Sequence, residues 1–152
     1  MTLIELILVM ALLTVLIGIA MPTLTRFFRG RRTQEEARRL LALTRYARSE
    51  AMARATPMEV WIDPARRAYG LRPRLEADQD RPPLQYPLAD GLDLEVDHKQ
   101  LDGRGQARIE FLSDGTLDEE SLASVGIQSG NGGDTEAITL ERTESGLGYE
   151  IQ

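Results

Sequence analysis

The 152-residue chain contains no cysteine and only one histidine, His98. These absences exclude thiol nucleophiles, disulfides and thiolate zinc sites, and a single imidazole cannot form a clustered zinc site. They do not place the chain in the cytosol, because a domain of this size can fold without disulfides in an oxidising compartment. The apolar and charged fractions, 42% and 28%, are those of a folded protein.

The sequence also lacks the pattern of an enzyme. His98 lies between Asp97 and Lys99 in a charged stretch, and no serine, histidine and aspartate share a spacing that indicates a catalytic triad. Without an organised nucleophile and base, we expect no catalytic residues, no cofactor and no small-molecule substrate.

Acidic residues near two turns are the remaining candidates for a metal site. Their spacing matches no recognised calcium loop, and acids in exposed loops are usually solvated. We therefore expect no metal site. The residues concerned are Asp114, Asp118, Glu119, Glu120 and Asp134.

Charge is absent from Leu6 to Thr25, where most residues are Leu, Ile, Val, Met or Ala. Roughly 20 consecutive apolar residues are enough to cross a bilayer as a helix. The sequence therefore predicts a transmembrane helix within residues 1–25.

The charges that follow are unevenly distributed. Between Arg26 and Arg54, nine arginines and three glutamates give a net charge of +6, whereas nine basic and twenty acidic residues from Ala55 onward give −11. We therefore divide the chain into a transmembrane helix (1–25), an amphipathic helical stalk (26–55) and a β-rich globular domain (56–152).

A single helix is predicted from near Thr2 to about Ala55, ending at Thr56-Pro57. Gly18 and Pro22 are expected to interrupt it, because proline lacks the backbone donor that the helix needs. Beyond Pro22, apolar and small residues recur at steps of three and four, which is typical of a helix that packs by one face onto a sheet. This face consists of Ala37, Leu40, Leu41, Thr44, Ala47, Ala51 and Ala55.

The rest of the chain alternates in the manner of short strands separated by turns, and we predict an α+β fold with the helix packed on antiparallel sheet. Turns are predicted at Asp63-Pro64, Asp102–Gly105, Gly130–Asp134 and Glu144–Gly146, and a loop at Glu76–Pro83. The predicted strands are Met58–Ile62, Ala68–Arg72, Leu92–Val96, Ala107–Leu112, Ser124–Gln128, Ala137–Arg142 and Leu147–Ile151.

Glu5 is the most informative residue of the apolar segment. An ionised carboxylate in such surroundings costs several kcal/mol unless it is paired, so an acid in a membrane span is by default functional. The nearby cation that could pair with it is an α-amino terminus, and that of a neighbouring subunit would serve. The alternative is that Glu5 lies at the interfacial end of the span and stays solvated.

The first thirty residues resemble a known family. Met1-Thr2-Leu3-Ile4-Glu5-Leu6-Ile7, followed by an apolar run with Pro22, is similar to the mature N-terminus of type IV pilins and type II secretion pseudopilins. The resemblance implies that a prepilin peptidase removes a short basic leader before Met1 and that the new terminus is N-methylated. It also implies that Glu5 neutralises the terminal amine of an adjacent subunit. Phenylalanine is usual at the first position, so Met1 is a departure, and we expect this chain to be the processed form.

Looser motifs further along resemble the minor pseudopilin H (GspH/FimT) class. They are the helical segment Leu40–Ala55 with Ala47–Ala51, the strand Met58–Ile62, and Ile109–Gly115. This class implies a β-sandwich-like pair of sheets on the helix. It also implies assembly with I-, J- and K-type pseudopilins near the tip of a type II secretion pseudopilus, on an inner-membrane assembly platform.

The expected topology follows from the resemblance. Arginines normally stay on the cytoplasmic side of a span, which would put the C-terminal domain inside the cell. The family implies the opposite, because its basic leader keeps the N-terminus inside. We therefore expect a single-pass inner-membrane protein whose C-terminal domain is periplasmic.

Two other functions stay open. A minor type IV pilin of the FimT kind, for pilus biogenesis or DNA uptake, would share these motifs, but we do not expect nucleic-acid binding because the basic residues lie on the stalk and the domain is acidic. Arg104 and Arg108 form only a weak basic patch. A bitopic membrane protein with a binding domain is the third possibility, and in it Glu5 would be replaceable.

Overall fold

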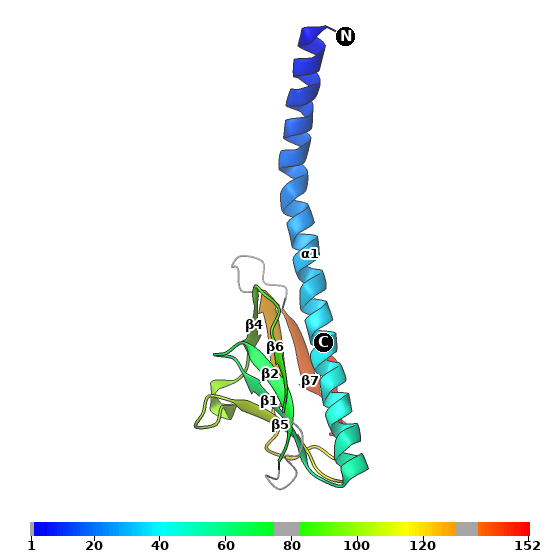
Figure 1. The fold of residues 1–152 in the computed structure, drawn as a ribbon, viewed down its shortest axis with the longest axis vertical. Helices are drawn as coiled ribbons and strands as arrows, with labels where there is room; N and C mark the ends of the chain where they lie inside the picture. The colour runs from blue at the N-terminus through cyan, green and yellow to red at the C-terminus, as the bar shows by residue number, and fades with distance from the viewer. Residues whose placement is uncertain (1, 75–82, 130–136) are drawn as a thin grey trace. The chain divides into compact units, whose positions relative to one another are not determined.

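The computed structural model describes residues 2–74, 83–129 and 137–152, with the side chains of residues 19–29 left out (Figure 1). The chain forms two compact units, Met1–Arg32 and Thr33–Gln152. The first unit is helical from Leu3 onward, and the second contains the remainder of the helix and all the described strands. The predicted segment boundaries near residues 25 and 55 stay predictions.

Helix α1 extends from Leu3 to Arg54 as one element. Gly18 and Pro22 lie within it, in agreement with the single helix predicted from near Thr2 to about Ala55, and the interruption expected at these two residues stays a prediction. A proline removes one hydrogen-bond donor, and the adjacent turns keep theirs. A local loosening at Pro22 stays a prediction. The helix ends because Ala55 takes a left-handed conformation (φ 50°). The Thr56 N–H then donates to the Ala51 carbonyl at 3.2 Å, which is the hydrogen bond of a Schellman cap.

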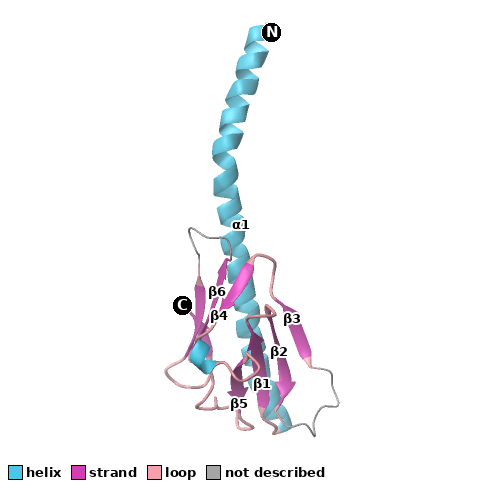
Figure 2. Cartoon of the chain, turned by 90° about the vertical axis from the view of Figure 1, so that its left-hand side faces the viewer, coloured by secondary structure: helices cyan, strands magenta, loops and turns pink. Residues whose placement is uncertain are grey.

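Two four-stranded antiparallel sheets complete the second unit, which confirms the α+β fold (Figure 2). The first has the order β3-β2-β1-β5 and the second the order β4-β6-β7-β8. The strands of the first are β1 (Met58–Asp63), β2 (Ala68–Pro73), β3 (Leu84–Pro87) and β5 (Ala107–Phe111). Those of the second are β4 (Leu92–Glu95), β6 (Ser124–Ser129), β7 (Ile138–Arg142) and β8 (Tyr149–Ile151).

The predicted strands all lie in these sheets, but the turn at Asp102–Gly105 does not join paired strands. It follows the short 3-10 helix η2 (His98–Gln100), and the strands on either side, β4 and β5, belong to different sheets. Their partners are β6 and β1, which lie far away in the sequence. The turn at Gly130–Asp134 and nearly all of the loop at Glu76–Pro83 lie outside the described residues.

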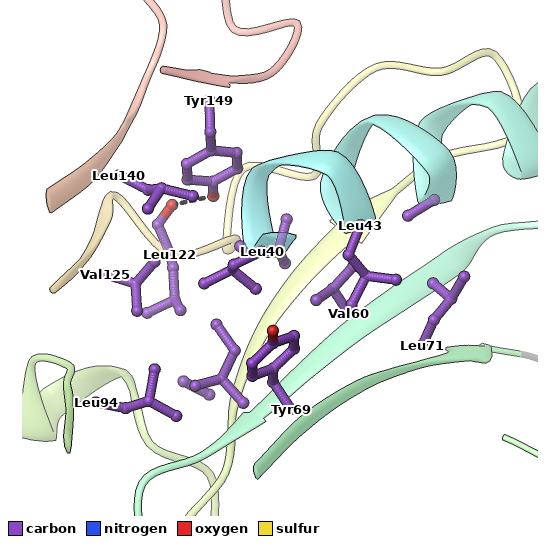
Figure 3. Close-up of a cluster of buried hydrophobic side chains, with 14 of the residues drawn as sticks. Leu40, Leu43, Val60, Tyr69, Leu71, Leu94, Leu122, Val125, Leu140 and Tyr149 are labelled. Atoms are coloured by element: carbon purple, nitrogen blue, oxygen red, sulfur yellow. Dashed lines mark hydrogen bonds between the residues drawn. The ribbon is translucent and has the colours of Figure 1, made fainter. Parts of the chain in front are cut away.

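The core lies between the helix and both sheets. Figure 3 shows Leu40 of α1 between Val60 and Tyr69 of the first sheet and Leu122 and Leu140 on the side of the second. The predicted apolar face of the helix is largely confirmed, with Leu41 partly buried, but Ala55 is exposed because the helix has already ended there. Buried helix residues of this face are Ala37, Leu40, Thr44, Ala47 and Ala51, together with Leu43, which was not part of the predicted face.

Candidate assembly site

Glu5 lies in the first turn of α1 and is exposed. The Thr2 N–H lies 3.4 Å from Glu5 Oε2, so the carboxylate contacts the backbone of its own N-terminal turn. The free N–H groups of a helix start carry partial positive charge, which makes this position favourable for an acid. Met1 lies outside the described residues. The predicted pairing of Glu5 with the amine of a neighbouring subunit stays a prediction.

Apolar side chains are exposed along the helix from Leu3 to Ile17. Leu3, Ile4 and Leu8 are 78%, 73% and 65% exposed, where a folded monomer in water would bury side chains of this kind. The other exposed apolar residues are Leu6, Ile7, Val9, Met10, Leu12, Leu13, Val15, Leu16 and Ile17. This surface therefore needs apolar surroundings supplied by something other than the described part of the chain.

The hydroxyl of Thr14, which lies in this apolar surface, has a hydrogen-bond acceptor in its own helix. Thr14 Oγ1 donates to the Met10 carbonyl at 2.8 Å, one turn earlier. An internal hydrogen bond of this kind lets a hydroxyl lie in apolar surroundings without an unpaired donor.

Over the described residues, no helix is long and apolar enough to cross a membrane. The transmembrane assignment of residues 1–25 stays a prediction.

A buried polar contact joins the stalk to the first sheet. The Tyr69 hydroxyl on β2 donates to Glu36 Oε1 on α1 at 2.5 Å, and both side chains are buried. Burial, together with the hydrogen bond and the negative charge of Glu36, raises the pKa of Tyr69 far above its ordinary value. Arg39 lies 3.9 Å from Glu36 and stacks over the Tyr86 ring at 4.5 Å. This site was not predicted from the sequence, because the predicted apolar face of the helix did not include Glu36.

A second buried network lies across the first sheet, where Glu59 of β1 is paired in register with Glu110 of β5. Arg74 Nη1 bridges them, at 3.4 Å from Glu59 and 2.8 Å from Glu110, and Arg72 Nη2 donates to Glu59 at 2.5 Å. Burial raises the pKa of Glu110 although Arg74 opposes the shift. The sequence carried a signal for this network, since glutamates in two apolar strands need basic partners such as those at the end of β2.

Two acids near turns, Asp114 and Asp97, accept local hydrogen bonds. Asp114 Oδ1 accepts from the backbone N–H and the hydroxyl of Thr116, and these bonds lower the pKa of Asp114. Asp97 caps η2 by accepting from the Lys99 N–H at 3.0 Å, and His98 is exposed. Among the described residues, no three His, Cys, Asp or Glu side chains are placed to hold a metal ion. Asp134 lies outside those residues.

The basic residues Arg104 and Arg108 of the domain do not form a joint basic patch. Arg108 pairs with Glu120, and Arg104 is exposed on the turn before β5. The predicted assembly surface therefore consists of two features of the first unit. They are the apolar side chains of the helix and the single acid, Glu5, near its start.

A family model described as type II transport protein GspH matches residues 36–146. The chain belongs to this family, which is one of pilin-like structural proteins, and the resemblance to the GspH class is confirmed. No curated protein matches the chain.

Solved structures of minor pilins and pseudopilins share the fold. The type IV minor pilin FimU of Pseudomonas aeruginosa PAO1 superposes with a TM-score of 0.55 at 18% identity, over 79% of this chain and 86% of that one. The minor pseudopilin EpsH from the type 2 secretion system of Vibrio cholerae also gives a TM-score of 0.55, at 14% identity, over 79% of this chain and 95% of that one.

Proposed function

We propose that this protein is a minor pseudopilin of a type II secretion system, assembled near the tip of a pseudopilus that drives folded proteins across the outer membrane. The GspH family match supports the pilin-like role. The observation that carries the proposal is the run of exposed apolar side chains from Leu3 to Ile17 on α1, with one acid, Glu5, in the first turn. A helix of this kind needs lipid or other apolar helices around it, and a filament core of packed helices supplies the second of these surroundings.

In this proposal the apolar helix has two successive environments. Before assembly it is held in the inner membrane, with the second unit in the periplasm. During assembly it leaves the lipid and packs among the helices of other major and minor pseudopilins, including I-, J- and K-type subunits. Because lipid and neighbouring helices are about equally apolar, the exchange costs little, and polar pairing decides the register.

Glu5 supplies that pairing. Its carboxylate meets the positively charged, N-methylated terminus of the preceding subunit, and each group removes the desolvation cost of the other. A prepilin peptidase produces this terminus by cleaving before Met1, and the inner-membrane platform then adds the subunit to the filament. Catalysis and cofactors have no part in this function.

The test is the mass of the N-terminus. The full reading frame is expressed with and without a prepilin peptidase, and the N-terminal peptide is measured by mass spectrometry. We expect a leader to be removed and Met1 to be N-methylated only when the peptidase is present. An unprocessed start at Met1 in both strains would contradict the proposal and favour a membrane-anchored binding domain without a filament.

A minor type IV pilin is the second candidate, because the likeness to FimU is as strong as the likeness to EpsH. The two functions differ in what a deletion abolishes. Loss of exoprotein in the culture medium with normal pili identifies the secretion subunit. Loss of surface pili or twitching with normal secretion identifies the pilus subunit.

A further inference from the structure

A hollow of about 330 Å³ lies in the second unit between α1, the end of β5 and the turn that joins β7 to β8. Its size is at the small end of ligand pockets, about 300–1,000 Å³, and it suits one or two side chains. Phe111 and Tyr149 form a buried apolar floor, and Leu147 lines the hollow at 41% exposure. Arg45 and Arg48 contribute from the helix.

Arg48 is held in place by the turn at 113–116. Its Nε donates to the Gly115 carbonyl at 3.0 Å. This turn is pressed against the helix, since a Cβ on Gly115 would lie 2.7 Å from Met52 Sδ, and the positive φ of 82° also favours glycine. One edge of the guanidinium is thereby fixed, and its two Nη groups keep donors for another partner.

Both arginines lack an acidic partner among the residues that the structure describes. Thr143 and Ser145 bond each other at 3.0 Å, Thr143 Oγ1 also lies 3.1 Å from the Gly148 carbonyl, and the Tyr149 hydroxyl donates to the Leu122 carbonyl. The donors of the site therefore come from Arg45 and Arg48. Glu144 is exposed in the same turn but does not line the hollow.

We propose that this hollow binds the carboxylate of an acidic segment from a neighbouring protein subunit. Two guanidinium groups over an apolar floor match a glutamate or aspartate flanked by apolar residues, because the planar fork of arginine pairs with carboxylate by two parallel hydrogen bonds. A nucleic acid fits less well, since the net charge of −11 from Ala55 onward repels a polyanion. The identification of the neighbour as a filament subunit rests on the proposed function. The binding of a carboxylate by the two arginines does not depend on that function.

The chemistry is tested on the full chain in zwitterionic detergent with the peptide Ac-Leu-Glu-Glu-Leu-NH2. Binding is followed by the NMR signals of the arginine Nε–H groups. We expect saturable shifts of the Arg48 signal, no shifts with Ac-Leu-Gln-Gln-Leu-NH2, and a dissociation constant about tenfold higher in Arg45→Gln, which corresponds to the loss of one charge-assisted contact. Arg45 is used because replacing Arg48 also frees the turn at Gly115.

Arg38→Gln is the matched control, because Arg38 is exposed on the same helix and does not line the hollow. It should leave the dissociation constant unchanged. Equal binding of the amide peptide, an equal loss in Arg38→Gln, or tighter binding of a single-stranded oligonucleotide would each overturn the proposal.

A second experiment in cells separates this proposal from the proposed function. A photo-crosslinking residue is placed at Leu147, which lines the hollow and is partly exposed, or at Leu8, on the apolar helix. We expect the Leu147 crosslink to lie in an acidic segment of another subunit, to disappear in Arg45→Glu, and to return when the captured acid is changed to lysine. Crosslinks from Leu8 but none from Leu147 would overturn the carboxylate site and leave filament assembly intact. Absence of crosslinks from Leu8 would contradict filament assembly, and the peptide titration would then decide whether the carboxylate site exists.

Discussion

The Tyr69 hydroxyl on β2 donates a 2.5 Å hydrogen bond to the Glu36 carboxylate on α1. Both side chains are buried, Tyr69 completely. The bond lies where the helix first joins the second unit, only three residues after Thr33. It therefore fixes the rotation of the helix on the sheet at a point where alanine and leucine contacts alone would permit small shifts.

Tyr69→Phe should lower the free energy of unfolding by about 2 kcal/mol, because hydrogen bonds to a charged group contribute about 1.5–3 kcal/mol and Glu36 would stay buried. The measurement is thermal or urea unfolding of the full chain in detergent, followed by circular dichroism. Tyr46→Phe is the matched control: Tyr46 is 46% exposed on the same helix and should change the stability by less than about 0.5 kcal/mol. Equal effects of the two substitutions would show that the buried hydrogen bond contributes nothing.

Stability should also fall at alkaline pH because of two buried tyrosines. Burial is the main cause that raises the pKa of both Tyr69 and Tyr149 above the ordinary value. Below pH about 10, both are protonated in the folded and unfolded chain, so stability does not depend on them. Above it the unfolded chain releases protons that the folded chain retains, and stability decreases by about 1.4 kcal/mol per pH unit for each tyrosine.

Unfolding measured at pH 9, 10 and 11 checks this dependence. Tyr69→Phe should remove about half of the decrease between pH 10 and 11, since one of the two retained protons is then absent. An unchanged slope in this variant would show that Tyr69 is not the titrating group.

The local elements were predictable from the sequence because they depend on local patterns. The strands β4 and β5 alternate cleanly, and the apolar stripe of the helix recurs at helical spacing. Strand β3 was missed because Leu84–Pro87 follows a proline-rich stretch and itself contains a proline, which an edge strand tolerates. The assignment of β4 and β5 to different sheets was not predictable, since it depends on pairing with residues far along the chain.

The buried charges were missed for a related reason. Alternation in β1 places Glu59 on the face opposite Val60, and that face normally meets water. In the structure it is covered, and Glu59 is 5% exposed. Only the three-dimensional pairing of β1 with β2 and β5 brings Arg72, Arg74 and Glu110 to it, so the sequence shows the residue types but not their proximity.

Gly70→Ala should be strongly destabilising. Gly70 lies on β2, and a Cβ there would come within 2.0 Å of the Leu84 carbonyl of β3 and 2.6 Å of the Trp61 ring. Because one obstacle is backbone, relief requires β3 to move, and we expect a loss of about 3 kcal/mol, at the upper end of overpacking costs. Trp61 is the only tryptophan, so its fluorescence reports the change directly. Gly103→Ala has nothing within 4 Å and serves as control.

Arg74→Gln should destabilise the protein in a pH-dependent way. Removal of Arg74 leaves Glu59 and Glu110 close together and takes away the opposite charge that stabilises ionised Glu110. Arg74 is 40% exposed, so the loss at pH 7 should be only about 1 kcal/mol. Because the folded chain then binds a proton at Glu110 more readily than the unfolded chain, part of the loss should be recovered as the pH falls toward 5.

Unfolding at pH 5 and 7 measures this effect. Adding Glu110→Gln to Arg74→Gln should restore most of the stability at pH 7. Arg66→Gln is the control, since Arg66 is 80% exposed in its ion pair with Asp63 and should contribute little. A loss in Arg74→Gln that is the same at both pH values would exclude Glu110 as the cause.

Glu5 tests the proposed assembly most directly. Glu5→Gln keeps the size and the hydrogen-bonding capacity of the side chain but removes the charge, so it should leave membrane localisation and processing at Met1 unchanged. If Glu5 neutralises a neighbouring terminus, loss of a buried opposite charge costs about 3–5 kcal/mol, which is enough to reduce incorporation into the filament more than a hundredfold. The measurement is the amount of the protein in sheared or crosslinked filaments.

Glu5→Asp and Thr14→Val separate charge from packing. Glu5→Asp retains the charge with a shorter reach and should keep partial incorporation. Thr14→Val removes a hydroxyl that bonds only within its own helix and should assemble normally. Normal incorporation of Glu5→Gln would contradict a paired carboxylate and leave the interfacial, solvated glutamate as the correct interpretation. A defect in Thr14→Val as large as that in Glu5→Gln would show that assembly depends on general packing of the apolar helix and not on the charge of residue 5.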